Sequence, residues 1–364
     1  MSKIREVRVY DTPPGRTANF GEQMPQFVFE ALLVQITDEE GRSGFSQPMA
    51  IHGEGRFLAR YVLDVLAPLV IGEDARQPEA IWQKMVGSLY DQPRTAVGLV
   101  DVAVWDLAGK IAGVSVLEML GGYRTSIPAY ASTMTLATLA EYAAETKAMV
   151  EAGYQAIKLH VYGEPHRDIE ACEVTRDAVG PDVDLMLDVM GGYLYDKRAA
   201  IEVGRELERL GFCWYEHPLR EDDVEGQREI CRKLDIPVAG PNGLRELSDH
   251  AEFIRHRATD IVRPDAGLQG GITMQMKIGH MAEIFHIGCE PHCWGYPMMQ
   301  AANLMGTLAI PAATYFEVAV PTGFQDLLAP GILPDAKGVV HAPTGPGLGI
   351  EIDMDELESR GTNL

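Results

Sequence analysis

The sequence predicts an α/β protein in which an α+β unit precedes a (β/α)8 barrel. Three observations support this prediction. The chain has 364 residues, 46% of them hydrophobic, which is enough for a large domain and a smaller one. Short apolar strands alternate with amphipathic helices after about residue 125, and glycines follow the helices. The stretch "GGYRTSIPAY" marks the boundary between the two patterns.

The first 125 residues carry the pattern of an antiparallel sheet followed by helices. Strands are predicted at residues 3–10 and 26–49, and the second stretch turns back on itself at "DEEG". Apolar residues then recur at helical spacing in "RFLARYVLDVLAPLV", "PEAIWQKMVGSLY" and "AVGLVDVAVWDLAGKIAG". We therefore predict an α+β domain over residues 1–125.

Residues 126–330 carry the strand–helix alternation of a barrel. The eight predicted strands are "IPAYAS", "QAIKLHV", "DLMLDVM", "FCWYEH", "IPVAG", "DIVRP", "GCEPH" and "YFEVA". Predicted helices end before glycines that favour a left-handed cap: 138–152 before Gly153, 166–179 before Gly180, 196–210 before Gly211 and 272–287 before Gly288. A doubly wound open sheet is the alternative. We prefer the barrel because no GxGxxG loop follows the first strands.

Polar side chains stand near the ends of predicted strands two to eight. In "QAIKLHVYG", Lys158 and His160 share one face of a strand, which we expect to open on the barrel mouth. The later strands supply Asp188, Glu216, Asn242, Asp265, His292 and Glu317. Each of these alone could be a surface charge or a helix cap. Because the carboxyl ends of barrel strands meet at one rim, the whole series predicts an active site.

The residue types at this rim indicate a metal site between acid–base groups. Asp188, Glu216 and Asn242 are hard oxygen ligands on adjacent strands, which suits Mg²⁺. His160 and His292 are candidate acid–base groups on opposite sides, and we expect Asp265 to orient His292 through a hydrogen bond. This set suits abstraction of a proton next to a carboxylate, with the metal stabilising the charge that forms.

At these residues the sequence resembles the mandelate racemase-like members of the enolase superfamily, whose use of a Lys or His base with Mg²⁺ is a well-known case. "VGLVDVAVWDLAGKIAGVSVLEMLGG" resembles the family's helix that runs up to the barrel, and "RPDAGLQGGIT" resembles its sixth-strand loop. The resemblance implies that the N-terminal domain is a cap, which residues 331–364 complete. It also implies that cap loops near 12–26 and 45–57 close over the substrate.

The sequence departs from the family pattern at two positions. Many relatives have a second lysine where this chain has His160, and most have a glutamate where it has Asn242. An imidazole can still accept a proton near pH 7. Glucarate dehydratases resemble this chain in having asparagine as the third ligand. The resemblance then implies that Lys158 contacts the substrate carboxylate.

For this subgroup the resemblance implies dehydration of a sugar acid to a 2-keto-3-deoxy acid, with His160 as base and His292 as acid. Glu317, His52 and Tyr296 are candidate substrate contacts, although lone loop residues such as the last two are often simply exposed. Met24, Met298, Met299 and Trp294 suggest a less polar mouth than a sugar-diacid pocket needs. A racemase, epimerase or cycloisomerase therefore stays open, as does a barrel without catalysis.

Charge and cysteine content narrow the partners and the compartment. The formal net charge of −22 repels nucleic acid and anionic membranes, and no apolar stretch approaches the ~18 residues of a membrane helix. The start of the sequence carries no signal segment, and five cysteines without a CxxC pair suit reduced thiols in a cytoplasm. "CEPHC" offers too few ligands for structural zinc. We expect a cytoplasmic homo-oligomer that acts on a small carboxylate.

Overall fold

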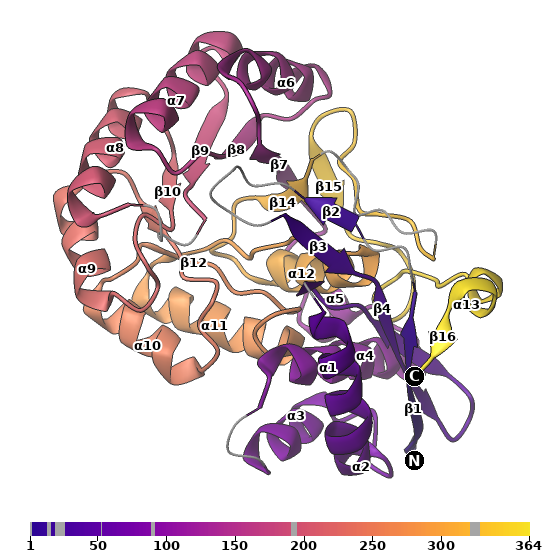
Figure 1. Ribbon diagram of the computed structural model, residues 1–364. Coiled ribbons are helices and arrows are strands. Elements are labelled where there is room, and N and C mark those ends of the chain that lie inside the picture. Colours follow the sequence, from indigo (N-terminus) through magenta and orange to yellow (C-terminus); the bar gives the residue numbers. More distant parts are fainter. Residues whose placement is uncertain are drawn as a thin grey trace.

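The computed structural model describes residues 2–12, 16–18, 26–51, 53–88, 92–190, 195–320 and 328–364. The chain forms a barrel of strands surrounded by helices, beside a smaller unit of strands and helices (Figure 1). Both chain termini lie in this smaller unit (Figure 1). Within the described ranges, no helix is both long and apolar enough to cross a membrane.

In the described part of the chain, eight parallel strands form the barrel: β7 (Ser126–Thr135), β8 (Ala156–His160), β9 (Asp184–Asp188), β10 (Trp214–Glu216), β11 (Val238–Ala239), β12 (Ile261–Val262), β13 (Gly288–Cys289) and β14 (Phe316–Ala319). Their order is β13-β12-β11-β10-β9-β8-β7-β14. The end of β13 contacts the segment that leads into β14, where Cys289 N donates to Ala312 O (3.3 Å) and the Glu290 carboxylate accepts from Thr314 N (2.8 Å). The predicted barrel is confirmed.

Helices cover the outside of the barrel (Figure 1). They are α6 (Leu139–Glu151), α7 (Pro165–Val179), α8 (Lys197–Arg209), α9 (Val224–Lys233), α10 (Leu247–His256), α11 (Gly271–Phe285) and α12 (Pro297–Ala309). Gly153 and Gly211 have the positive φ that a left-handed cap requires, whereas Gly180 has a positive φ (79°) with an extended ψ (−178°) and does not form such a cap. The prediction for Gly288 is wrong, because α11 already ends at Phe285 and His286 takes the left-handed conformation (φ 55°).

The smaller unit contains two antiparallel sheets and the remaining helices. One sheet has the order β16-β1-β4-β5 and the other β2-β3-β6. The strands are β1 (Ile4–Asp11), β2 (Arg16–Ala18), β3 (Phe27–Glu30), β4 (Leu32–Asp38), β5 (Ser43–Ser46), β6 (Ala50–Ile51) and β16 (Thr362–Asn363). The helices are α1 (Glu54–Tyr61), α2 (Ala67–Val70), α3 (Pro78–Gly87), α4 (Arg94–Ala112), α5 (Val116–Met119) and α13 (Met354–Arg360). The predicted helix over 56–70 is α1 and α2 joined by a π-helical turn, Val62–Leu66.

The C-terminal tail returns to the N-terminal unit, as the predicted fold class requires. β16 pairs with β1, with Asn363 opposite Tyr10. Between the barrel and β16, β15 (Val339–His341) pairs antiparallel with the start of β7. The Asp106 carboxylate on α4 accepts Phe45 N (2.9 Å) and Leu348 N (2.8 Å), which ties the sheet and the tail to one helix. The exact domain boundaries stay predictions.

Helix α4 also packs directly on the barrel. Gly98 allows the close approach, because a Cβ there would lie 2.7 Å from Ala266 O. One turn later the buried Asp101 carboxylate accepts Thr273 N (3.0 Å) and Thr273 Oγ1 (2.7 Å) at the start of α11. The cap is therefore anchored to the helix that follows strand β12.

Candidate active site

Lys158 lies inside the barrel among carboxylates. It is fully buried, and the opening of this strand face on the barrel mouth stays a prediction. Its Nζ lies 2.8 Å from Glu317 Oε1, 3.0 Å from Glu216 Oε2 and 3.4 Å from Asp188 Oδ2. Burial acts to lower the pKa of the ammonium, but Glu216 and Glu317 outweigh burial and raise the pKa. Lys158 is therefore a buried cation.

His160, at the end of β8, has its two ring nitrogens in different surroundings. Nδ1 lies 2.5 Å from the backbone carbonyl oxygen of Thr133, and Nε2 lies 3.2 Å from Asp188 Oδ2. Because a carbonyl oxygen can only accept, Nδ1 carries a hydrogen. A neutral His160 therefore keeps its lone pair on Nε2, which faces the carboxylates. The Trp294 ring packs edge-on against this imidazole, 5.7 Å between ring centroids.

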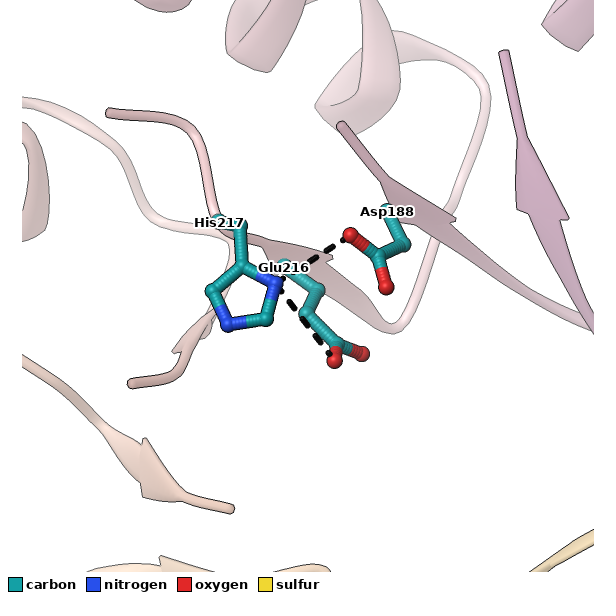
Figure 2. Close-up of side chains that lie close together, drawn as sticks. All are labelled: Asp188, Glu216 and His217. Atoms are coloured by element: carbon teal, nitrogen blue, oxygen red, sulfur yellow. Dashed lines mark hydrogen bonds and ion pairs between the residues drawn. The ribbon is translucent and has the colours of Figure 1, made fainter. Parts of the chain in front are cut away.

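Asp188 and Glu216 end two neighbouring strands in register. One ligand atom each of Asp188, Glu216 and His217 lie within 4.8 Å of one another, and Figure 2 shows the three side chains converging. Burial alone would raise the pKa of Asp188, but Lys158 and His160 hold that pKa well below its usual range. Ionised carboxylates at one strand edge fit a hard divalent cation.

His217 bridges two carboxylates and was not predicted as a site residue. Its Nδ1 lies 3.2 Å from Asp188 Oδ1, and its Nε2 lies 3.1 Å from Glu221 Oε1. Burial acts to lower the pKa of the imidazole, but Asp188 and Glu221 raise it to about 10. A protonated imidazole has no lone pair for a metal, so His217 in this state stabilises its neighbours instead.

Asn242, the predicted third ligand, lies three residues beyond β11 and is half-buried. Its backbone N–H donates to Glu221 Oε1 (2.8 Å), and its carbonyl oxygen accepts from Gln269 Nε2 (2.7 Å). Glu221 thus joins the backbone of Asn242 to the imidazole of His217. These contacts fix the backbone of Asn242, while the coordination of a metal by its side chain stays a prediction.

His292 follows β13 and pairs with Asp265. Its Nδ1 lies 2.6 Å from Asp265 Oδ2. The other carboxylate oxygen of Asp265 accepts Gly267 N (2.6 Å) and Asn303 Nδ2 (3.2 Å), which holds the carboxylate in one orientation. Because the carboxylate accepts from Nδ1–H, Nε2 is the ring nitrogen left for exchange of a proton.

Glu317 lies on β14 and has both oxygens engaged. Oε1 accepts from Trp294 Nε1 (3.1 Å) and contacts Lys158, while Oε2 accepts from Cys293 N (2.9 Å) and Arg263 Nη2 (2.8 Å). Burial acts to raise the pKa of Glu317, but Lys158 and Arg263 hold it well below its usual range. Of the other two predicted substrate contacts, Tyr296 donates to Phe29 O (3.3 Å), and His52 lies outside the described residues.

Family models match most of the chain. "Mandelate racemase / muconate lactonizing enzyme, N-terminal domain" matches residues 4–121, and "Enolase C-terminal domain-like" matches residues 141–356. The chain belongs to the enolase superfamily. A solved superfamily structure, D-glucarate dehydratase from Agrobacterium tumefaciens complexed with magnesium, is 31% identical, with a TM-score of 0.85 and 99% of each chain covered.

Two further superfamily members are similar over most of their length. D-galactarolactone cycloisomerase from Agrobacterium fabrum is 29% identical, with 90% of each chain covered. Arabinonate dehydratase from Saccharolobus solfataricus is 28% identical, with 89% of this chain and 88% of the relative covered. The superfamily members that resemble this chain therefore include both lyases and an isomerase.

The candidate site of this chain contains residues that were not predicted from the sequence. Arg263 stands one position after β12, and its positive charge in "DIVRP" was a usable signal, because a buried strand end rarely carries an unpaired cation. His217 directly follows Glu216 and could have been noticed in the same way. Glu221 gave no such signal, since "LREDD" has the charge pattern of an exposed loop.

Proposed function

We propose that this enzyme removes the α-proton of a small carboxylate with Mg²⁺ and eliminates the β-hydroxyl group, converting a sugar acid to a 2-keto-3-deoxy acid. One observation carries the proposal. His160 and His292 stand on non-adjacent strands beside the ionised carboxylates, and each has its Nδ1 fixed by an acceptor. Similarity to an arabinonate dehydratase and to a D-glucarate dehydratase supports a sugar acid as substrate.

Asp188 and Glu216 would hold the metal, with Asn242 as a third oxygen ligand. Both carboxylates are buried at adjacent strand ends, and a set of oxygen donors fits Mg²⁺. When bound, Mg²⁺ supplies Lewis-acid stabilisation of the negative charge that develops on the substrate carboxylate.

The side chains of this protein would divide the proton transfers between them. Lys158 binds the substrate carboxylate and makes the neighbouring α-proton more acidic, while Glu317 keeps the ammonium in place. His160 Nε2 accepts the α-proton. His292, oriented by Asp265, donates a proton from Nε2 to the leaving β-hydroxyl group, which departs as water. The enol product then tautomerises to the ketone.

A second candidate function is isomerisation of a less polar acid or lactone, as a racemase, epimerase or cycloisomerase. The observation in its favour is an apolar cluster beside His160. Trp294 stacks on Phe29 of the cap (6.5 Å between centroids), and the partly buried Met49, Met134 and Met190 pack on the same cluster. Similarity to a cycloisomerase supports it as well. Two bases beside one carbon can also exchange its proton.

Turnover across a sugar-acid and lactone library, with Mg²⁺ and with EDTA, tests both candidates. We expect a 2-keto-3-deoxy product that forms with Mg²⁺ and is absent with EDTA. Inversion at the α-carbon in D₂O without a keto product would favour the isomerase. If no acid undergoes turnover or α-proton exchange with Mg²⁺, both candidates are wrong.

A further inference from the structure

Arg263 is a fully buried cation beneath the candidate metal site. All three of its donor nitrogens are used: Nε donates to Glu216 Oε1 (2.9 Å), Nη2 to Glu317 Oε2 (2.8 Å) and Nη1 to the backbone carbonyl oxygen of Glu290 (2.8 Å). The guanidinium therefore connects strand β10 with strand β14, and the carbonyl just after β13 fixes its plane.

Arg263 and Lys158 together hold the same two carboxylates. Lys158 Nζ contacts Glu216 Oε2 and Glu317 Oε1, which are the oxygens that Arg263 leaves free. The four side chains thus form a closed ring of alternating charges, and each carboxylate is bound on both oxygens. Neither carboxylate can rotate without breaking a contact to a buried cation.

We propose that Arg263 is a positioning residue, which fixes Glu216 in the orientation for binding Mg²⁺ and Glu317 in the orientation for holding Lys158. The inference rests on the proposed function and assigns a role to a residue that neither contacts substrate nor binds metal. A planar guanidinium can hold carboxylates on two strands in a set geometry, whereas an ammonium acts as a point charge.

Charge balance gives the same residue a second effect. Asp188, Glu216 and Glu317 bring three negative charges, and Lys158 and Arg263 bring two positive ones, so the five buried groups carry −1. Without Arg263 the sum is −2, and Glu216 and Glu317 compete for one ammonium. The ammonium would then be drawn away from the place where the substrate carboxylate is to bind.

The variant Arg263→Lys tests the proposal, because lysine keeps the positive charge and lacks the planar set of N–H donors of the guanidinium. The measurement is the Mg²⁺ affinity of the whole protein by isothermal titration calorimetry, followed by kcat and KM with an accepted substrate. We expect Mg²⁺ binding to weaken by about 10–100-fold, as is typical when a partner of a metal ligand is changed, and kcat to fall. An affinity and a kcat equal to those of the wild type would contradict the proposal.

Arg176→Lys is the matched control. Arg176 also donates hydrogen bonds from all three guanidinium nitrogens. Its acceptors are backbone carbonyl oxygens outside the site, those of Leu210, Gly180, Val183 and Gly211. This control can lower Tm and should leave the Mg²⁺ affinity unchanged. An equal loss of Mg²⁺ affinity in both variants would make the effect general destabilisation and overturn the role of Arg263.

A second variant keeps the proposal testable if Arg263→Lys does not fold. Glu317→Gln removes the charge from the partner that Arg263 and Lys158 share, and we expect weaker Mg²⁺ binding although Glu317 is not a proposed ligand. Unchanged affinity in Glu317→Gln would overturn the ring. If the wild type itself binds no Mg²⁺, the proposed function fails and this inference fails with it, whereas equal wild-type and variant affinities overturn the inference alone.

Discussion

Two sets of buried carboxylates in the described part of the molecule differ in the direction of their pKa shifts. At the barrel centre, Asp188 and Glu317 have pKa values well below the usual range, because cations outweigh their burial. At two places where neighbouring elements pack together, which we call the seams, the pKa shifts have the opposite direction. Burial raises the pKa of Asp101, between α4 and α11, and that of Glu290, between β13 and β14, to about 7 each.

The partners of each carboxylate explain the difference. Asp188 and Glu317 face the ammonium of Lys158, whereas Asp101 accepts from the backbone and hydroxyl of Thr273 and from the backbone of Ile272. Glu290 likewise accepts from backbone N–H groups and a hydroxyl. The neutral donors around Asp101 and Glu290 offset the loss of hydration incompletely, whereas the cations that contact Asp188 and Glu317 outweigh it. Carboxylates that are equally buried thus differ in their role. Those at the barrel centre are ionised and suit a cation, whereas those at the seams are structural and titrate near neutral pH.

The largest expected effect separates the two regions directly. Asp188→Asn and Glu216→Gln should each lower kcat/KM by orders of magnitude, because both remove a proposed ligand of the ion that stabilises the developing charge. Asp101→Asn is the matched control, since it neutralises an equally buried carboxylate away from the site and should leave kcat/KM close to that of the wild type. Full activity of the wild type in EDTA would contradict the role of the metal.

The next effect concerns the two imidazoles at the centre. His160→Asn should abolish both dehydration and exchange of the substrate α-proton in D₂O, since loss of a general base costs about 10²–10⁴-fold. His292→Asn should block dehydration and still allow slow exchange, because His292 acts only on the leaving group. Proton NMR of the substrate in D₂O measures both. Exchange that persists in His160→Asn and vanishes in His292→Asn would reverse the two roles.

The barrel could be predicted from the sequence because its signals are local. The spacing of apolar residues and the glycines after the helices can be recognised in each strand–helix unit separately. The sequence also predicted which side chains gather at the rim, since all strand ends of a barrel meet there. It could not predict that Lys158 pairs with three carboxylates, because that depends on distances between strands far apart in the sequence. The bridge from His217 to Glu221 was missed although the two residues are close in the sequence, because "LREDD" has the charge pattern of an exposed loop. The left-handed residue at His286 was missed as well.

A smaller effect should follow if the centre loses its central cation. Lys158→Met leaves Asp188, Glu216 and Glu317 buried with one fewer cation, and breaking a buried ion pair typically costs about 3–5 kcal/mol. Carboxylates with depressed pKa values stabilise the fold above their unfolded pKa of about 4, and this contribution is lost as the pH falls. The stability difference from the wild type should therefore be full at pH 7 and shrink as the pH falls below about 4, as measured by urea denaturation. A difference that is constant with pH would contradict the ionic role of Lys158.

The smallest effect tests the seam. The pKa of Asp101 is about 7 in the folded protein against 3.8 for the free group, so its contribution to stability is fully present below pH 3.8 and is lost as the pH rises through 7. Between pH 5 and pH 8 the wild type should lose on the order of 2 kcal/mol through this one group, because each tenfold change in proton affinity corresponds to about 1.36 kcal/mol. Asp101→Asn has no charge to bury, so its unfolding free energy should fall less over the same range. Glu290 titrates in the same window in both proteins, and its contribution cancels when the two urea-denaturation series are subtracted. Parallel pH profiles for the wild type and Asp101→Asn would mean that Asp101 is ionised in the fold at neutral pH, and the contrast between seam and centre would then disappear.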